Sequence, residues 1–368
     1  MQKVVFLSCG DISGDRWASH IIQLLRKRLP RVSVVALGGE ESAKSGAHLL
    51  ENTVSHSLVG FSEVLRGFSF WRRTWNRARE FITREQPAVF LAIDSPGFNL
   101  PLVRFCARRG IPIVYFAPPQ VWAWGRWRGK FLASYADSIL YFFPWEGKYF
   151  AGGKAQAIWV GHPLRVLMEG KVPTRSLDPR VILVLPGSRK HEVTAFFPVF
   201  REFFIHYGVH FSGYRFVLVS ASSTLQPFLE REKGSLPLTI VDWEALYPLL
   251  GEAKLAISTS GTVTLEVALG GIPQVIVYRT SWTNFLLGRL FFRGSHIGLP
   301  NILLGREIAP ELVQGGLTPT TLFRAIQRIL SDVEISQRAR VWAEEIKRQL
   351  GDGKTFEKTV EVISHYLQ

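Results

Sequence analysis

The sequence predicts an α/β protein built from two Rossmann-like, doubly wound parallel-sheet domains with a cleft between them. Three observations lead to this fold class. Short apolar segments alternate with helical patterns along the chain, and these segments lack the two-residue alternation of half-exposed strands. The length of 368 residues also exceeds what one ordinary core accommodates.

The first half of the chain alternates predicted strands and helices. Strands are expected at residues 4–8, 32–37, 88–93, 112–116, 138–141 and 157–160. Helices are expected between them at residues 17–28, 68–84, 100–109 and 126–134. A linker is predicted from the Gly-His-Pro-Leu run at 161–164 and the polar residues 172–180.

The second half repeats the alternation. Strands are expected at residues 181–185, 215–220, 238–241, 254–257 and 274–278. Helices are expected at residues 192–207, 243–250, 264–269, 319–330, 333–350 and 354–367. The predicted domains are residues 1–164 and 165–345, and a C-terminal helix within 346–368 is expected to cross back to the first domain. Ligands of such sheets bind beyond the carboxyl ends of the strands.

The net charge of +14 points to an anionic partner or surface. The positive charge is concentrated at residues 66–84 and 122–130, where Arg and Lys stand beside Trp and Phe, among them Trp71 and Trp75. This pattern is typical of a helix lying on anionic lipid. It would also fit nucleic acid or a plain basic surface, but no nucleic-acid-binding motif accompanies it, so we expect no nucleic-acid partner.

The chain has the composition of a globular protein, with 47% hydrophobic residues and no apolar run long enough to span a membrane. The first residues enter a predicted strand without a leader pattern. Cys9 and Cys106 lie far apart in the sequence and need not pair. A reduced, cytoplasmic protein is therefore expected.

A strand, a glycine-containing loop and a helix follow one another at residues 255–269. Ser260, Gly261 and Thr262 form the loop, and Glu266 lies in the first turns of the helix. Helix N-termini offer free N–H groups and partial positive charge to phosphate, and a carboxylate one turn further can accept from ribose hydroxyls. The pattern indicates a nucleotide diphosphate, although ordinary helix capping would use the same residues.

A similar loop opens the second domain, where Gly187, Ser188 and Arg189 follow a predicted strand. Arg189 is placed to clamp phosphate together with residues 260–262. His162 and His191 have no evident metal-binding partners, and no carboxylates show metal-ligand spacing. We therefore expect no metal or other cofactor, with Arg and helix ends neutralising a leaving diphosphate.

In the first domain, polar residues follow two predicted strands. The first group, at residues 10–15, contains Gly10, Asp11, Ser13, Gly14 and Asp15. The second contains Asp94, Gly97 and Asn99. Glycines allow close approach of a ligand, and carboxylates can hold a substrate hydroxyl. Capping of the following helices is the alternative role for Asp15 and Asp94.

Several segments together resemble the lipid-A-disaccharide synthases, bacterial glycosyltransferases of the GT-B type. The matching segments are SGD at 13–15, LVGFSEVL at 58–65, IDSPGFNL at 93–100, APPQVWAW at 117–124, FPWE at 143–146, VGHPL at 160–164, LPGSRKHE at 185–192, SGTVTLE at 260–266 and GLPNILLGREIAPEL at 298–312. They cover nearly the whole chain in the family's order.

This resemblance implies an inverting transfer of 2,3-diacylglucosamine from its UDP donor to 2,3-diacylglucosamine 1-phosphate. The products would be UDP and a β-1,6-linked disaccharide 1-phosphate of lipid A synthesis. Acylated substrates imply a peripheral enzyme on the cytoplasmic face of the inner membrane, with Trp71, Trp75, Trp282 and Phe285 at the lipid or acyl chains. A homodimer is left open.

By position, the resemblance assigns a set of residues to UDP and another to the acceptor. The UDP set is Arg189, Ser188, Ser260, Gly261, Thr262, Glu266, Asn301 and Arg306. The acceptor set is Gly10, Ser13, Gly14, Asp15, Glu63 and Asn99, with Asp94 and Asp11 as candidate catalytic carboxylates.

The sequence departs from the family at one important position. Its usual IDAPDFN is IDSPGFN here, so Gly97 replaces a candidate catalytic aspartate. Asp94 or Asp11 then serves as base, or the chain is a divergent paralogue with another lipid or envelope acceptor, or a catalytically weak membrane-associated binder of UDP-sugar or lipid. A UDP-N-acetylglucosamine epimerase shares the architecture, but the lipid-facing segments argue against it.

Overall fold

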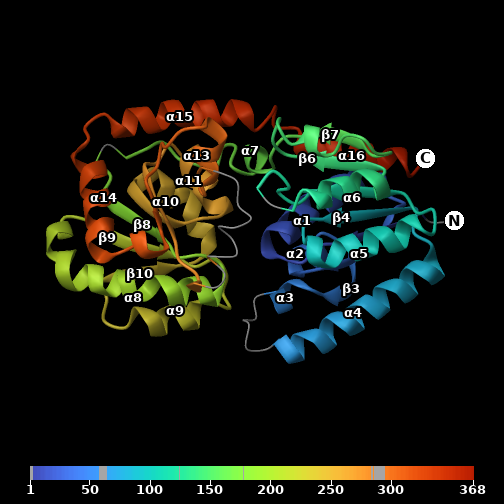
Figure 1. Ribbon diagram of the computed structural model, residues 1–368, viewed down its shortest axis with the longest axis horizontal. Helices are drawn as coiled ribbons and strands as arrows, with labels where there is room; N and C mark the ends of the chain where they lie inside the picture. Colours follow the sequence, from blue (N-terminus) through green and yellow to red (C-terminus); the bar gives the residue numbers. More distant parts are fainter. Residues whose placement is uncertain (1–2, 58–63, 124, 177, 283–284, 286–294) are drawn as a thin grey trace. The chain divides into compact units, whose positions relative to one another are not determined.

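The computed structural model describes residues 3–57, 64–123, 125–176, 178–282, 285 and 295–368. The chain forms two compact units (Figure 1). The first consists of Met1–Val166 together with Leu350–Gln368, and the second consists of Leu167–Gln349. The C-terminal segment, red in Figure 1, therefore belongs to the first unit, where the Tyr366 hydroxyl lies 2.9 Å from that of Ser138.

The first unit contains a seven-stranded sheet whose described pairs are all parallel, in the order β3-β2-β1-β4-β5-β6-β7. Its strands are β1 (Val4–Ser8), β2 (Ser33–Gly38), β3 (His48–Asn52), β4 (Val89–Ile93), β5 (Ile113–Phe116), β6 (Ser138–Tyr141) and β7 (Gln156–Trp159). The order reverses at β1, so the loops after β1 and β4 lie next to each other.

Helices cover both faces of this sheet. They are α1 (Ile12–Arg28), α2 (Glu40–Lys44), α3 (Val54–Ser57), α4 (Val64–Glu85), α5 (Pro96–Ala107), α6 (Trp127–Tyr135), η2 (Gly147–Tyr149) and α16 (Thr355–His365). One buried cluster joins Ile82 of α4, Val103 of α5 and Leu132 of α6 to Phe90 of β4. On α1, His20 stacks on Phe356 of α16, with 5.0 Å between ring centroids.

The second unit contains a six-stranded parallel sheet in the order β10-β9-β8-β11-β12-β13. Its strands are β8 (Val181–Leu185), β9 (Arg215–Val219), β10 (Leu238–Val241), β11 (Ala253–Thr259), β12 (Gln274–Tyr278) and β13 (Glu311–Val313). The strands β8, β11 and β12 are adjacent, so their carboxyl ends meet at one edge.

Successive residues of the strands face two different helical layers in this unit. Its helices are α8 (Lys190–Tyr207), η3 (Gly208–Phe211), α9 (Gln226–Lys233), η4 (Trp243–Ala245), α10 (Leu246–Glu252), α11 (Thr262–Leu269), α13 (Leu299–Leu304), η5 (Gln314–Gly316), α14 (Pro319–Ser331) and α15 (Ile335–Gln349), while α7 (Leu164–Leu167) connects the units. Ile182 packs with α8 and α14, and Leu183 packs with α10 and α11. Burial on both faces explains the continuous apolar strands.

The predicted fold class is confirmed, with corrections at the margins. The edge strands β3 and β13 and the helices α2, α9 and α13 were not predicted. The predicted linker at 172–180 packs on the second unit, because Arg175 donates to the carbonyl oxygens of Ala253 and Gly271, both at 3.2 Å. Among the described residues, no helix has the length and apolarity needed to span a membrane.

Candidate active site

The loop between β11 and α11 is held by short polar contacts. The Ser260 amide donates to the Val277 carbonyl at 2.9 Å, and Gly261 is the N-cap of α11. The Thr264 hydroxyl donates back to the Gly261 carbonyl at 2.8 Å. The N–H groups of Thr262 and Val263 belong to the first turn of α11, and such N–H groups have no hydrogen-bond acceptor within the helix. This geometry suits an anion.

A second segment fixes this loop from the side of α13. The Ser260 hydroxyl donates to the Ile297 carbonyl at 2.9 Å. The amides of Ile297 and Gly298 each donate to the Glu311 carboxylate, also at 2.9 Å. Glu311, at the start of β13, was missed by sequence reasoning, and its partners lie 13 and 14 residues away in the chain. Only the fold brings them together.

Arg189 stands at the start of α8 beside Glu192. The Glu192 carboxylate accepts from the amides of Ser188 at 3.0 Å and Arg189 at 3.2 Å, and it pairs with the Arg189 guanidinium at 3.3 Å. A carboxylate of the chain therefore already occupies these two amides, and the clamping of phosphate at this loop stays a prediction. The part of the loop that remains suited to phosphate is the guanidinium of Arg189, whose side chain is 60% exposed.

The end of β12 belongs to the same neighbourhood. Burial raises the pKa of the Tyr278 phenol, the negative charge of Glu192 adds to this rise, and the positive charge of Arg189 opposes it. Because β11 lies between β8 and β12, the loop at Ser260 follows the strand between those that precede Arg189 and end at Tyr278. The strand-end loops after β8, β11 and β12 thus form one polar edge of the second unit.

The remaining residues assigned to UDP differ in their placement. Glu266 is 6% exposed and lies in the second turn of α11. Asn301 is fully buried; its amide nitrogen donates to Ala309 O and Glu311, and its oxygen accepts from the amides of Ile308 and Ala309. The structure therefore gives Asn301 a positioning role, and its contact with UDP stays a prediction.

Arg306 follows α13 and is directed to α15. Its guanidinium pairs with Glu345 at 2.6 Å. The contact of Arg306 with UDP stays a prediction. Glu345 belongs to α15, which also packs on α11. The ion pair therefore connects the end of α13 to a helix that contacts α11.

In the first unit, two aspartates follow β1, and both act as helix caps. Asp11 is the N-cap of α1 and accepts from the Gly14 amide at 2.6 Å. Asp15 is 4% exposed and accepts from the amides of Gly39, Glu41 and Ser42 and from the Ser42 hydroxyl. The carboxylate of Asp15 thus holds the start of α2, and its role at the substrate stays a prediction.

The loop after β4 has unusual backbone geometry. Asp94 and Ser95 have φ angles of 44° and 46°, in the left-handed region that residues other than glycine seldom adopt. The Asp94 carbonyl accepts from the Tyr115 hydroxyl at 2.7 Å and the Asn99 amide at 2.9 Å. Such strain persists where the surroundings over-determine it, and it clusters at functional sites.

The loops after β1 and β4 are brought together. A Cβ on Gly10 would lie 2.6 Å from the Ser95 hydroxyl oxygen, so a larger residue there would require the Ser95 side chain to move. Asn99 is fully buried and also donates to Ser8 O at 3.3 Å. The structure therefore unites Gly10, Asp11, Gly14, Asp94 and Asn99, with Ser13 half-buried in the first turn of α1. Glu63 lies outside the described residues.

Gly97, in the first turn of α5, is exposed and has open space around it. A Cβ at this position would meet no heavy atom within 4 Å. The residue that replaces the family's aspartate therefore faces outward beside the strained loop, and a larger side chain fits there.

The aromatic residues assigned to lipid fall into two groups. On α4, Trp71 lies 5.1 Å from the ring of Phe98, and Trp75 lies 6.2 Å from that of Phe105, so both are partly covered by α5. In the second unit, Trp282 is 62% exposed and meets Phe285 edge to face. Among the described residues, no three His, Cys, Asp or Glu side chains gather in a way that would hold a metal ion.

Comparison with known proteins decides the family. The family described as Lipid-A-disaccharide synthetase matches residues 5–361. The lipid-A-disaccharide synthase of Syntrophotalea carbinolica is 32% identical over 371 residues, which cover 98% of this chain and 94% of the relative. That of Neisseria meningitidis serogroup C is 35% identical over 338 residues, which cover 88% of this chain and 87% of the relative. The chain belongs to the lipid-A-disaccharide synthase family.

Solved structures support the GT-B fold of this family member. The kitacinnamycin glycotransferase has a TM-score of 0.64 at 16% identity and covers 100% of this chain and 99% of its own. The UDP-GlcNAc 2-epimerase of Neisseria meningitidis, bound to UDP-GlcNAc, also has a TM-score of 0.64, at 10% identity, with 99% and 100% covered. At such identities the likeness concerns the fold alone. The predicted family and fold class are confirmed.

Proposed function

We propose that the chain transfers 2,3-diacylglucosamine from its UDP donor to 2,3-diacylglucosamine 1-phosphate, with inversion at the anomeric carbon. The products are UDP and the β-1,6-linked lipid A disaccharide 1-phosphate. Membership of the lipid-A-disaccharide synthase family supports this activity. The observation that carries it is the pair of polar strand-end loops, one around Ser260 in the second unit and one around Asp94 in the first.

The second unit binds the donor in this proposal. The N–H groups of the first turn of α11 and the guanidinium of Arg189 hold the diphosphate. Glu266 accepts hydrogen bonds from the ribose hydroxyls. Asn301 and Glu311 contribute indirectly, because their hydrogen bonds fix residues 297–298, on which the Ser260 hydroxyl rests.

We assign the role of general base to Asp94. It removes the proton from the acceptor 6-hydroxyl as that oxygen attacks C1 of the donor sugar, while the bond from C1 to the diphosphate oxygen breaks. Both electrons of that bond leave with UDP. Asp11 is the weaker candidate, because its carboxylate serves as the N-cap of α1. The strained backbone at Asp94 supports the choice.

The charge of the departing UDP is neutralised by the chain itself in this proposal. Arg189 supplies a full positive charge and α11 supplies the partial charge of its N-terminus. A metal ion is not required for this step, and its absence from the reaction is part of the proposal. Activity in the presence of a chelator is the corresponding test.

The proposal places the chain on an anionic lipid surface, on the cytoplasmic side of the inner membrane. The net charge of +14 and the arginines of α4 support this location. Exposed Trp127 and Trp282 add apolar contact area. Acylated substrates reside in such a surface, so a peripheral enzyme reaches them without spanning the membrane.

The deciding experiment measures UDP release from UDP-2,3-diacylglucosamine in detergent with EDTA, with and without the sugar phosphate acceptor. We expect acceptor-dependent release and a loss of about 100-fold to 10,000-fold in kcat for Asp94→Asn. Asp11→Asn is the matched control, because Asn caps helices as well as Asp does. Donor binding without turnover would mean that the chain is a binder of UDP-sugar instead.

A further inference from the structure

A groove on the first unit adjoins the loop of the proposed base. It is lined by residues of α4, α5 and α6 and has a volume of about 580 Å³. Volumes of roughly 300–1,000 Å³ are usual for small-molecule sites. Pro96 and Gly97 belong to the lining, so the groove comes within three residues of Asp94 in the chain.

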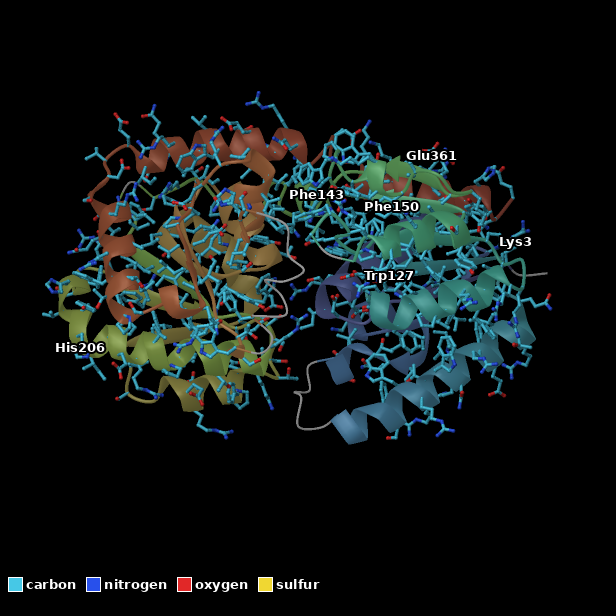
Figure 2. All side chains as sticks on the ribbon, viewed as in Figure 1. Lys3, Trp127, Phe143, Phe150, His206 and Glu361 are labelled. Atoms are coloured by element: carbon cyan, nitrogen blue, oxygen red, sulfur yellow. The ribbon has the colours of Figure 1, made fainter. Side chains whose placement is uncertain are left out.

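The groove offers a wide aromatic surface. Trp75, Phe105 and Phe131 are half-buried in its lining, and the rings of Trp75 and Phe105 lie 6.2 Å apart. Trp127, labelled in Figure 2, also lines the groove at the start of α6 and is 61% exposed. An apolar chain lying here would remove this aromatic surface from water.

The same lining is strongly basic. In the described part of the chain it contains four arginines and no Asp or Glu; the arginines are Arg79, Arg104, Arg108 and Arg128. The Arg79 guanidinium lies 4.9 Å from the ring centroid of Phe105. Arg104 in the last turn of α5 and Arg108 at its C-cap are exposed and four residues apart, so their side chains are neighbours.

These arginines differ from others on the same helices. On α4, Arg77 forms an ion pair with Glu51 at 2.7 Å, and Arg84 forms one with Glu85 at 2.8 Å. No carboxylate in the described part of the chain makes such a pair with Arg79, Arg104 or Arg108. The groove therefore has uncompensated positive charge beside an apolar surface, and this combination complements a phosphate that carries an acyl chain.

We propose that this groove binds the acceptor of the glycosyl transfer, an acylated sugar phosphate. Arg104 and Arg108, with Arg79 and Arg128, bind the phosphate, and the aromatic lining receives an acyl chain. This inference rests on the proposed function and names the acceptor subsite. The position of the groove favours the acceptor over a bulk phospholipid, because its lining continues into the loop of Asp94, where the acceptor hydroxyl must lie.

The test compares full-length wild type with the double variant Arg104→Ala, Arg108→Ala in detergent. We expect KM for the sugar phosphate acceptor to rise on the order of 10-fold to 100-fold. KM for the UDP donor and kcat should stay within about 3-fold. With an acceptor that lacks the 1-phosphate, KM should differ far less between the two proteins, because only wild type binds the phosphate through Arg104 and Arg108.

The matched control is Arg84→Ala, Lys130→Ala, which removes two positive charges from α4 and α6 outside the lining of the groove. An unchanged acceptor KM in the arginine variant, with weaker binding to phosphatidylglycerol vesicles, would overturn the proposal and make the groove a membrane contact. If wild type shows no turnover, the proposed function fails separately. Equilibrium binding of 2,3-diacylglucosamine 1-phosphate, lost in the arginine variant alone, would still support the groove.

Discussion

Glu146 accepts a hydrogen bond from the indole Nε1 of Trp122 at 3.1 Å. Its other oxygen accepts from the amides of Phe142 at 3.1 Å and Phe143 at 3.0 Å, and the residue is only 3% exposed. One carboxylate thus ties the loop after β5 to the loop after β6. These are the two segments whose sequences, APPQVWAW and FPWE, carry part of the family resemblance.

Glu146 makes the stability of the first unit depend on pH. Burial raises its pKa from 4.5 to about 7, although its three hydrogen bonds act in the opposite direction. Between these pH values the folded chain keeps a proton that the unfolded chain releases. The stabilisation is therefore complete below pH 4.5 and is lost as the pH rises through about 7.

We expect this loss to amount to roughly 1.4 kcal/mol per pH unit within that window. The measurement is urea unfolding of wild type and Glu146→Gln at several pH values. The difference in the free energy of unfolding between the two proteins should change with pH between about 4.5 and 7. A difference that stays constant over this range would contradict the raised pKa.

Gly187→Ala should disturb the donor site through Glu192. Gly187 has φ of +106°, and a Cβ there would lie 2.5 Å from the Glu192 carboxylate, which holds the amides of Ser188 and Arg189. We expect a loss of stability of about 2 kcal/mol or more. Calorimetry should also show UDP binding weakened by about 10-fold.

Gly170→Ala is the control for backbone strain alone, because Gly170 has φ of +70° and open space around it. It should lose about 1–2 kcal/mol of stability and bind UDP as wild type does. Equal effects of the two variants on UDP binding would mean that the contact of residue 187 with Glu192 has no influence on the donor site.

Asp15→Asn should destabilise the first unit without changing the acceptor KM. The carboxylate of Asp15 accepts from four donors, and an amide in its place turns an N–H group toward some of them. Hydrogen bonds to buried charged groups contribute about 1.5–3 kcal/mol each, so a loss of about 3 kcal/mol is expected in urea unfolding. Ser42→Ala, which removes one donor, should cost about 1 kcal/mol. A changed acceptor KM with unaltered unfolding would support the substrate role predicted from the sequence.

The sequence predicted the central strands closely because each is an apolar run buried on both faces. It missed the edge strands for the converse reason. In β3, the residues His48–Asn52 are mixed in polarity and partly exposed, and β13 has only three residues. Helix α1 begins at Ile12, five residues before the predicted start, because its cap, Asp11, precedes the apolar periodicity that begins at Trp17.

The candidate site was predictable only as far as topology determines it. In each sheet the carboxyl ends of the parallel strands lie at one edge. The loops at Asp94, Arg189 and Ser260 are therefore predictable from their positions directly after strands. Their partners were not found, because these depend on packing between distant segments. Ser260 contacts Ile297, 37 residues away, and nothing local in the sequence marks that pair.

The last prediction concerns Gly97, where the family usually has aspartate. Gly97→Asp should fold without strain, because a Cβ there meets no heavy atom within 4 Å and the residue lies in the first turn of α5. The new carboxylate stands near the positive end of that helix, and glycine is a poor helix former. We therefore expect the free energy of unfolding to rise by about 0.5–1 kcal/mol.

The catalytic effect of Gly97→Asp tests the assignment of the base. If Asp94 removes the proton, kcat should change by less than about 3-fold, since a second carboxylate supplies nothing that the reaction lacks. The acceptor KM is the less informative readout, because Gly97 lines the groove between α4, α5 and α6 that is proposed to bind the acceptor. Gly97→Asn separates the effect of charge from that of size. A rise in kcat above about 10-fold, or recovery of activity when Gly97→Asp is added to Asp94→Asn, would move the base to position 97.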